Sequence, residues 1–202
     1  KTFTRCDLTK HYDSGSAMAQ RILAGVNKLA DNVASTLGPR GRNVILQEKN
    51  KRPIITKDGV TVANFVDLDD PVENAAAQII KQAAEQTNSD AGDGTTTATV
   101  LSRAILSAAQ KYISSGVPPI ELQRGIERAV TELAVVLDAA SRPIMSEEDI
   151  AHVASISANN DKQIGRLIAQ AVSAAGKDGA ITVEEARSFQ TSLDLVEGFR
   201  MD

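Results

Sequence analysis

The chain has 202 residues and a formal net charge of -4, which suits one or two domains and gives no reason to expect nucleic acid or an anionic membrane as a partner. Only 3% of the residues are aromatic, so we expect a core of Ala, Val, Ile and Leu, which favours packed helices. Cys6 is the single cysteine, so an internal disulfide is excluded. The sequence contains no apolar run of about 18 residues, so we expect no membrane-spanning helix.

The first elements are a helix and a hairpin. Apolar side chains at helical spacing predict a helix over residues 14–35. Short strands are expected over residues 43–47 and 53–56, joined by a charged tip. Residues 57–59 predict a turn, and residues 60–62 a return to extended structure.

Five helices and two strands are expected in the rest of the chain. Prolines open two of the helices, and a Ser146-Glu-Glu-Asp sequence that resembles a capping box opens another. The helices are expected over residues 71–87, 95–114, 119–140, 146–155 and 160–175, and the strands over residues 180–184 and 191–196. The fold class is therefore mainly α with a small β-hairpin, followed by an α+β segment.

The segment most indicative of chemistry is Ala91-Gly-Asp-Gly-Thr-Thr-Thr-Ala98, at a predicted helix start. A helix N-terminus offers unpaired N–H groups and about half a positive charge, so it attracts anions. Asp93 is a hard oxygen ligand of the kind that Mg²⁺ uses together with phosphates. Taken alone, the segment also fits an Asp that caps a helix. Three consecutive β-branched threonines at a helix start are harder to explain by stability alone.

Two further segments allow an ordinary and a functional reading. Thr36-Leu-Gly-Pro-Arg-Gly-Arg is a helix stop or a loop that wraps a nucleotide, although it lacks the spacing of a Walker A loop. Thr56-Lys-Asp-Gly59 is a routine turn or a turn whose carboxylate orients an attacking water. The histidines His11 and His152 lack metal-ligand spacing, so we expect them to be structural.

Together, the three segments closely resemble the ATP-site motifs of group I chaperonins, the ring-forming ATPases that fold other proteins. They occur in the family's order and at its spacing, and the resemblance spans roughly residues 20–202. Further matching segments are Gly25-Val-Asn-Lys-Leu-Ala-Asp, Arg124-Gly-Ile, Ile156-Ser-Ala-Asn, Lys177-Asp-Gly-Ala-Ile-Thr-Val-Glu and Val196-Glu-Gly.

The resemblance implies a division into domains. Residues 1–142 correspond to the N-terminal half of the equatorial, ATP-binding domain. Residues 143–197 correspond to the first segment of the intermediate domain, and residues 198–202 begin the apical domain, with Gly198 at the hinge. The hairpin at residues 43–56 corresponds to one that the family uses in contacts between neighbouring subunits.

The resemblance also implies roles for single residues. Asp93 would bind Mg²⁺, main-chain oxygens of Thr36 and Lys57 would help to hold K⁺, and Asp58 would act in catalysis by placing the hydrolytic water. The residues expected to bind ATP are Thr36, Leu37, Gly38, Pro39, Lys57, Asp93, Gly94, Thr95, Thr96 and Thr97. Ser157 and Asn159 would lie near the site and the hinge.

The implied function is that of an ATP-dependent protein-folding subunit. Its expected partners are non-native client proteins, identical subunits in a ring of seven and a co-chaperonin. A cytoplasmic location is expected, with an organellar matrix or a viral origin as alternatives. A second reading is a truncated fragment that binds nucleotide or neighbouring subunits without turnover, because the family's return segment and C-terminal half lie beyond these residues. A third, an enzyme that uses ATP on a small molecule, has no substrate motif to support it.

Overall fold

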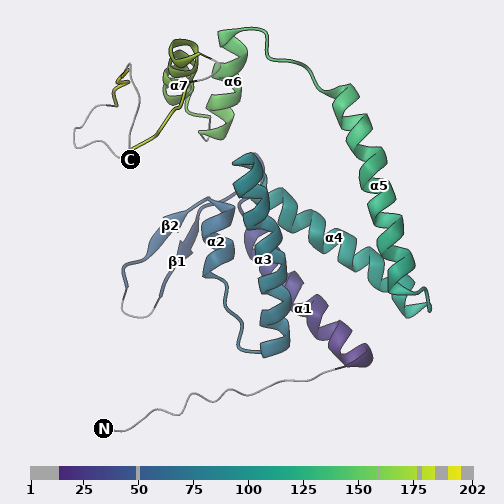
Figure 1. The fold of residues 1–202 in the computed structure, drawn as a ribbon. Coiled ribbons are helices and arrows are strands. Elements are labelled where there is room, and N and C mark those ends of the chain that lie inside the picture. Colours follow the sequence, from purple (N-terminus) through teal and green to yellow (C-terminus); the bar gives the residue numbers. More distant parts are fainter. Residues whose placement is uncertain (1–13, 49–50, 159, 177–178, 185–190, 197–202) are drawn as a thin grey trace. The chain divides into compact units, whose positions relative to one another are not determined.

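The computed structural model describes residues 14–48, 51–158, 160–176, 179–184 and 191–196, and in these ranges it contains seven helices and one two-stranded sheet (Figure 1). The elements in chain order are α1 Gly15–Ala34, β1 Val44–Leu46, β2 Ile54–Thr56, α2 Gly59–Phe65, α3 Pro71–Ala91, α4 Thr95–Ser114, α5 Pro119–Ala140, α6 Glu147–Ser157 and α7 Lys162–Ala175. The prediction of a mainly helical fold with one antiparallel hairpin is confirmed.

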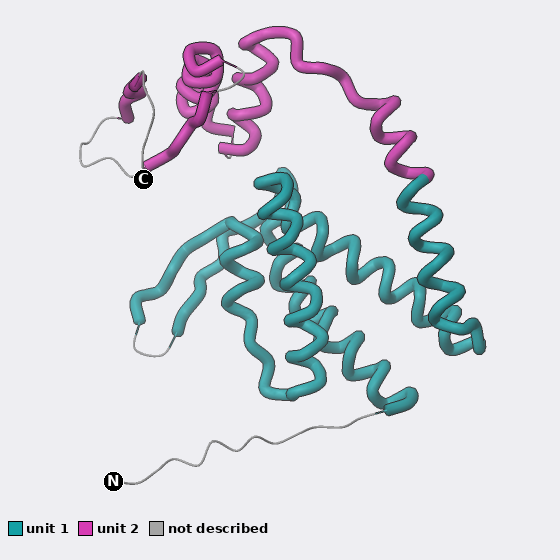
Figure 2. The backbone as a smooth tube through the Cα atoms, in the orientation of Figure 1, with its two compact units in different colours: residues 1–131 teal, residues 132–202 magenta. Residues whose placement is uncertain are grey.

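The chain forms two compact units, Lys1–Thr131 and Glu132–Asp202, which meet within α5 (Figure 2). The division therefore lies inside a helix, whereas the sequence placed a domain boundary after it. None of the helices in the described ranges is long and apolar enough to cross a membrane.

The core of the first unit is aliphatic, as the scarcity of aromatic residues predicts. Its buried cluster consists of Leu29, Val33, Val62, Ala63 and Ala77, which come from α1, α2 and α3. Small side chains allow helix axes to approach closely, and dense packing of this kind stabilises the fold without aromatic rings. The ends of α1 and α2 are thereby fixed against α3.

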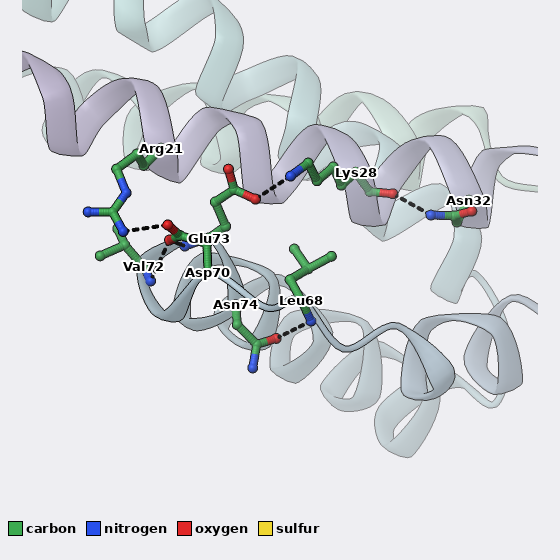
Figure 3. Close-up of polar contacts among 8 residues, drawn as sticks. All are labelled: Arg21, Lys28, Asn32, Leu68, Asp70, Val72, Glu73 and Asn74. Carbon is green, nitrogen blue, oxygen red and sulfur yellow. Dashed lines mark hydrogen bonds and ion pairs between the residues drawn. The ribbon is translucent and has the colours of Figure 1, made fainter. Parts of the chain in front are cut away.

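Helices α1 and α3 pack closely and are joined at their surface by two ion pairs (Figure 3). A Cβ at Gly25 would overlap the backbone of Glu73, so only glycine permits this approach. Arg21 pairs with Asp70 and Lys28 with Glu73, each at 2.5 Å. Asp70 also caps α3 by accepting hydrogen bonds from the N–H groups of its first turn.

The hairpin pairs β1 with β2 in antiparallel register, with Val44 opposite Thr56 and Leu46 opposite Ile54. Leu46 is buried, whereas Ile45 and Ile55, which are paired with each other, are both largely exposed. One face of the hairpin therefore packs on the unit and the other presents apolar side chains to solvent.

Two expectations about α2 and α3 were wrong. Residues 60–62 are helical rather than extended, because Asp58 accepts hydrogen bonds from the N–H groups of Val60 and Thr61 and so begins α2. Helix α3 ends at Ala91 rather than near residue 87, because Gly92 is the residue that takes a left-handed conformation and stops it.

The second unit contains the helices α6 and α7, which pack against each other. The predicted capping box at Ser146 is confirmed, since Ser146 and Asp149 exchange hydrogen bonds at the start of α6. A Cβ at Gly165 would lie 2.8 Å from the carbonyl oxygen of Ala151, so glycine again permits close packing of two helices.

The strands expected over residues 180–184 and 191–196 do not form in the described part of the chain, where both stretches are irregular. A strand needs a neighbour to satisfy its N–H and C=O groups, and no described segment pairs with either stretch. The α+β character predicted for residues 143–197 is thus not seen. Gly198 and Asn159 lie outside the described residues.

Candidate functional site

The turn between α3 and α4 is formed by two glycines with left-handed backbone. Gly92 has φ 71° and Gly94 has φ 91°, values that strain other residues. The N–H of Gly92 donates to the carbonyl of Asn88 at 2.8 Å and closes α3. The two glycines are therefore required by the shape of this turn, which holds Asp93 directly before α4.

The start of α4 differs from most helix starts in this structure. Within the described ranges, α4 has no side chain that caps its first turn. By contrast, α2, α3, α6 and α7 are capped by the side chains of Asp58, Asp70, Ser146 and Asp161. The first N–H groups of α4 thus have no side-chain acceptor and can bind an anion, which the helix dipole also favours.

The three threonines at the start of α4 do not share one environment. Thr95 is buried, and its carbonyl accepts a hydrogen bond of 2.9 Å from the hydroxyl of Thr99, also buried. Thr96 is half-buried and Thr97 is exposed. Packing therefore explains Thr95, while Thr97 is the threonine whose hydroxyl is most open to a ligand.

Asp93 is exposed and lies beside the N–H groups of this helix start. One of its carboxylate oxygens accepts a hydrogen bond of 2.6 Å from the N–H of Gly94. A carboxylate has about four lone-pair positions, so this bond leaves capacity for a cation. In the part of the chain that the structure describes, no group of three or more His, Cys, Asp or Glu side chains could hold a metal by itself. A lone carboxylate fits Mg²⁺ that phosphates also bind, rather than a cage built only of protein ligands.

The loop after α1 closes on itself through main-chain hydrogen bonds. The N–H of Gly41 donates to the carbonyl of Gly38 at 3.0 Å, and the N–H of Arg42 donates to that of Ser35 at 2.9 Å. Thr36 is buried, and its hydroxyl donates to the carbonyl of Val33 at 2.8 Å. The next three positions of the predicted site, residues 37–39, are exposed. The loop thus presents backbone and Leu37 to solvent, while the Thr36 hydroxyl is engaged within the protein.

Asp58 is held tightly by the first turn of α2. Its Oδ2 accepts from the hydroxyl of Thr61 at 2.6 Å and from the N–H of Thr61 at 2.9 Å, and its Oδ1 accepts from the N–H of Val60 at 3.3 Å. Partial burial raises the pKa of Asp58, but these hydrogen bonds from Thr61 and Val60 together outweigh it and leave the pKa lowered. The carboxylate is therefore ionised and fixed in direction at neutral pH.

Gly59 brings two of the predicted segments together and places α1 beside them. This residue is buried, and a Cβ there would overlap the hydroxyl oxygen of Thr96 and lie 3.5 Å from Cγ1 of Val33. The turn that bears Asp58 therefore packs directly on the first turn of α4, against the last turn of α1. Segments separated by more than thirty residues in the sequence meet at one place, as a shared site requires.

The polar side chains of α6 and α7 have no described contact with the site formed by Gly59 and the start of α4. A cavity of about 380 Å³ lies between α6 and α7, lined by residues that include Glu148, His152, Lys162 and Arg166. None of the residues predicted to bind ATP lines this cavity. His152 is exposed and lies 4.0 Å from Glu148.

Lys81 is a residue that the sequence motifs do not mark. It lies on α3 with only 5% of its surface exposed, and its Nζ donates to the carbonyl of Val66 just after α2. Lysine is rarely so buried unless it is paired. The sequence signal is its position on the buried face of α3, four residues after Ala77 and three before Ala84, both buried.

Comparison with known proteins identifies the family. A sequence profile of the TCP-1/cpn60 chaperonin family matches residues 29–202. Among solved structures, the chain is similar to the crystal structure of a group III chaperonin in the open state, with a TM-score of 0.67 and 28% sequence identity. That match covers 78% of this chain and 32% of the other, so the chain spans about a third of that structure's length. Because the family profile covers most of the sequence and all three motif segments, this chain belongs to the TCP-1/cpn60 chaperonin family.

Proposed function

We propose that the chain is part of a group I chaperonin subunit, which binds and hydrolyses ATP to drive conformational change in a ring that folds client proteins. The observation that carries this proposal is the packing of Gly59 on Thr96. That contact brings the turn that bears Asp58 to the first turn of α4, whose N–H groups have no side-chain acceptor. One group suited to water and one suited to phosphate then belong to the same site.

In this proposal the phosphates of ATP are bound at residues 94–97. The N–H groups of the first turn of α4 donate to phosphate oxygens, and the hydroxyls of Thr96 and Thr97 add further donors. Gly94 lets the phosphates approach the backbone closely. Asp93 would hold Mg²⁺, which neutralises phosphate charge when bound there.

Asp58 is proposed to orient the attacking water rather than to remove its proton. A general base works best when its pKa lies near the operating pH, and hydrogen bonds hold the pKa of Asp58 below its ordinary value. Because Thr61 and Val60 fix the carboxylate, its remaining lone pairs have a defined direction. Such a group accepts a hydrogen bond from water and positions the oxygen.

The loop after α1 is proposed to contact the rest of the nucleotide and K⁺. The hydroxyl of Thr36 is bonded to Val33, so Thr36 would act through its main-chain oxygen, as would Lys57. Leu37, Gly38 and Pro39 would contact ATP on the exposed side of the loop.

The larger assembly is also a proposal. Residues 1–142 would belong to the equatorial domain, residues 143–197 to the intermediate domain and residues 198–202 to the apical domain. The exposed apolar face of the hairpin suits a contact with an identical subunit in a seven-membered ring. Client proteins and a co-chaperonin would be the other partners, in the cytoplasm.

The test is Asp93→Ala in the full-length protein, with Asp90→Ala as its matched control. Both aspartates are exposed and lie at the same turn, but Asp90 bonds to Gln86 within α3. We expect Asp93→Ala to abolish Mg²⁺-dependent phosphate release at an unchanged circular-dichroism spectrum, and Asp90→Ala to leave turnover near wild type. Wild-type turnover should also fall when Na⁺ replaces K⁺. Normal turnover by Asp93→Ala would overturn the proposed role of the α4 start.

The exposed apolar side chains of α5 bear on the alternative, a fragment that binds nucleotide or neighbouring subunits without turnover, because either the rest of a longer subunit or a neighbouring subunit would cover them. This helix has no buried side chain among the described residues, and Val130, Leu133 and Leu137 are exposed along it. Apolar side chains in such number are normally covered by further protein. Intact mass of the natural protein separates the two readings.

A further inference from the structure

Lys81 is a charged residue in a buried position, which is unusual in proteins. It is buried on α3, and the helix positions around it on the same face are occupied by Ala77 and Ala84. Burying an ammonium group has a substantial free-energy cost unless hydrogen bonds and opposite charges offset it. The structure supplies both in part: the Nζ of Lys81 donates to the carbonyl of Val66. Burial lowers the pKa of Lys81, and the nearby carboxylates of Asp67 and Glu85 offset only part of that effect.

The acceptor of this hydrogen bond is the residue that ends α2. Val66 is the C-cap of α2, and the carbonyl groups at a helix C-terminus lack intrahelical donors and carry partial negative charge. Helix α2 has seven residues, too few to be stable by itself. A buried ammonium group at its last carbonyl therefore fixes one end of a helix that depends on its surroundings.

The other end of α2 carries the site. Asp58 caps its first turn, and Gly59 packs on Thr96 and Val33. Seven residues of α-helix span about 10 Å, so the two ends move together as a short rod. Whatever holds Val66 in place also sets the direction of the Asp58 carboxylate.

We propose that Lys81 is a positioning residue, which anchors the C-terminal end of α2 to α3 and so keeps Asp58 and Gly59 seated on the first turn of α4. Lys81 does not touch the nucleotide in this proposal, and it acts only through Val66 and α2. The inference rests on the proposed function for its effect on turnover, but the anchoring of α2 can be measured without ATP.

The experiment compares Lys81→Met with Lys28→Met in the full-length protein. Both substitutions remove an ammonium group and leave a long unbranched chain, but Lys28 pairs with Glu73 between α1 and α3 and does not contact α2 in the described hydrogen bonds. Methionine suits a buried site, but it leaves the carbonyl of Val66 without its donor, so a moderate loss of global stability is expected as well. Amide hydrogen exchange over residues 60–66 should become faster by about tenfold or more in Lys81→Met and remain unchanged in Lys28→Met.

Turnover provides a second readout, because a positioning role should lower kcat and leave KM unchanged, whereas a general loss of structure should affect both. Phosphates are proposed to bind at α4, with which Lys81 shares no described hydrogen bond, so KM for MgATP should change little. The value of kcat should fall by about ten- to a hundredfold, because a water-orienting group is misplaced. Lys81→Arg keeps the charge and the donors and should restore at least part of the exchange protection and of kcat. If Lys81→Met does not fold, Lys81→Gln takes its place in both measurements.

The outcomes separate the two proposals. Unchanged exchange over residues 60–66 in Lys81→Met overturns the anchoring role, whatever the turnover. Faster exchange with wild-type kcat in a protein that hydrolyses ATP overturns the link between the anchor and the reaction. If the wild-type protein neither binds nor hydrolyses ATP, the proposed function fails, while faster exchange confined to α2 still supports Lys81 as its anchor.

Discussion

The packing of Gly59 on Thr96 predicts a specific cost for a methyl group. In Gly59→Ala the new Cβ would overlap the hydroxyl oxygen of Thr96 and lie 3.2 Å from its Cβ. Overpacking of this kind typically costs about 1–3 kcal/mol. Alanine recovers about 1 kcal/mol through its better helix propensity, so we expect α2 and α4 to lose a net ~0–2 kcal/mol of stability.

The cause can be isolated with a double-mutant cycle. Thr96→Ala removes the overlapped oxygen, so Gly59→Ala should cost less in that background, with a coupling free energy of about 1 kcal/mol. Thr96→Val keeps an atom in the same place and should not relieve the cost. Gly125→Ala is the control, because a Cβ there meets nothing within 4 Å and should be neutral or stabilising by about 0.5–1 kcal/mol.

The assay is amide hydrogen exchange as a function of urea concentration in the full-length protein, read on peptides from α2 and α4. This readout gives local free energies of unfolding without requiring the whole protein to unfold in one step. If Gly59→Ala behaves like Gly125→Ala and shows no coupling to Thr96→Ala, then the two segments are not in contact and the argument for a shared site is wrong.

Two further predictions concern acid stability and isolated activity. Because the pKa of Asp58 is lowered in the folded protein, its ionised carboxylate stabilises α2 at pH values above the ordinary pKa of 3.8, and this stability is lost as pH falls through the folded-state pKa. Local hydrogen exchange at α2 should therefore show wild type losing stability between about pH 5 and 2 relative to Asp58→Asn, whose cap does not titrate. A difference between the two proteins that stays constant with pH would refute this. Residues 1–202 produced alone should be poorly soluble and show no steady phosphate release, because the exposed apolar side chains of α4 and α5 lack cover and a single water-orienting carboxylate leaves the site incomplete. Turnover comparable to the full-length protein, absent in an Asp93→Ala control of the same residues, would contradict the second prediction.

Helix boundaries were predictable wherever a local signal sets them. Pro71 and Pro119 open α3 and α5 as expected, and α4 runs from Thr95 to Ser114 as predicted. These limits depend on residues next to them in the chain, chiefly prolines and glycines. The capping box at Ser146 belongs to the same class, because both of its partners lie within four residues.

The failures arose where a single side chain or a distant partner decides the structure. Residues 60–62 are rich in β-branched side chains, which favour strands, but the Asp58 cap and burial of Val62 in the core select a helix. Strands over residues 180–184 and 191–196 would need neighbours that the described chain does not supply.

By itself, the sequence determined the helical class of the first unit, the hairpin and the three motifs that lead to the chaperonin family, because periodicity, turn residues and motif spacing are local properties. Only the tertiary structure decided that Gly59 sits on Thr96, that the Thr36 hydroxyl is engaged with Val33, and that Lys81 is buried at the end of α2. Each of these facts depends on how helices approach one another in space. The residues of α2 and α4 that approach each other are more than thirty positions apart in the sequence. No pattern within either segment could therefore have shown their contact.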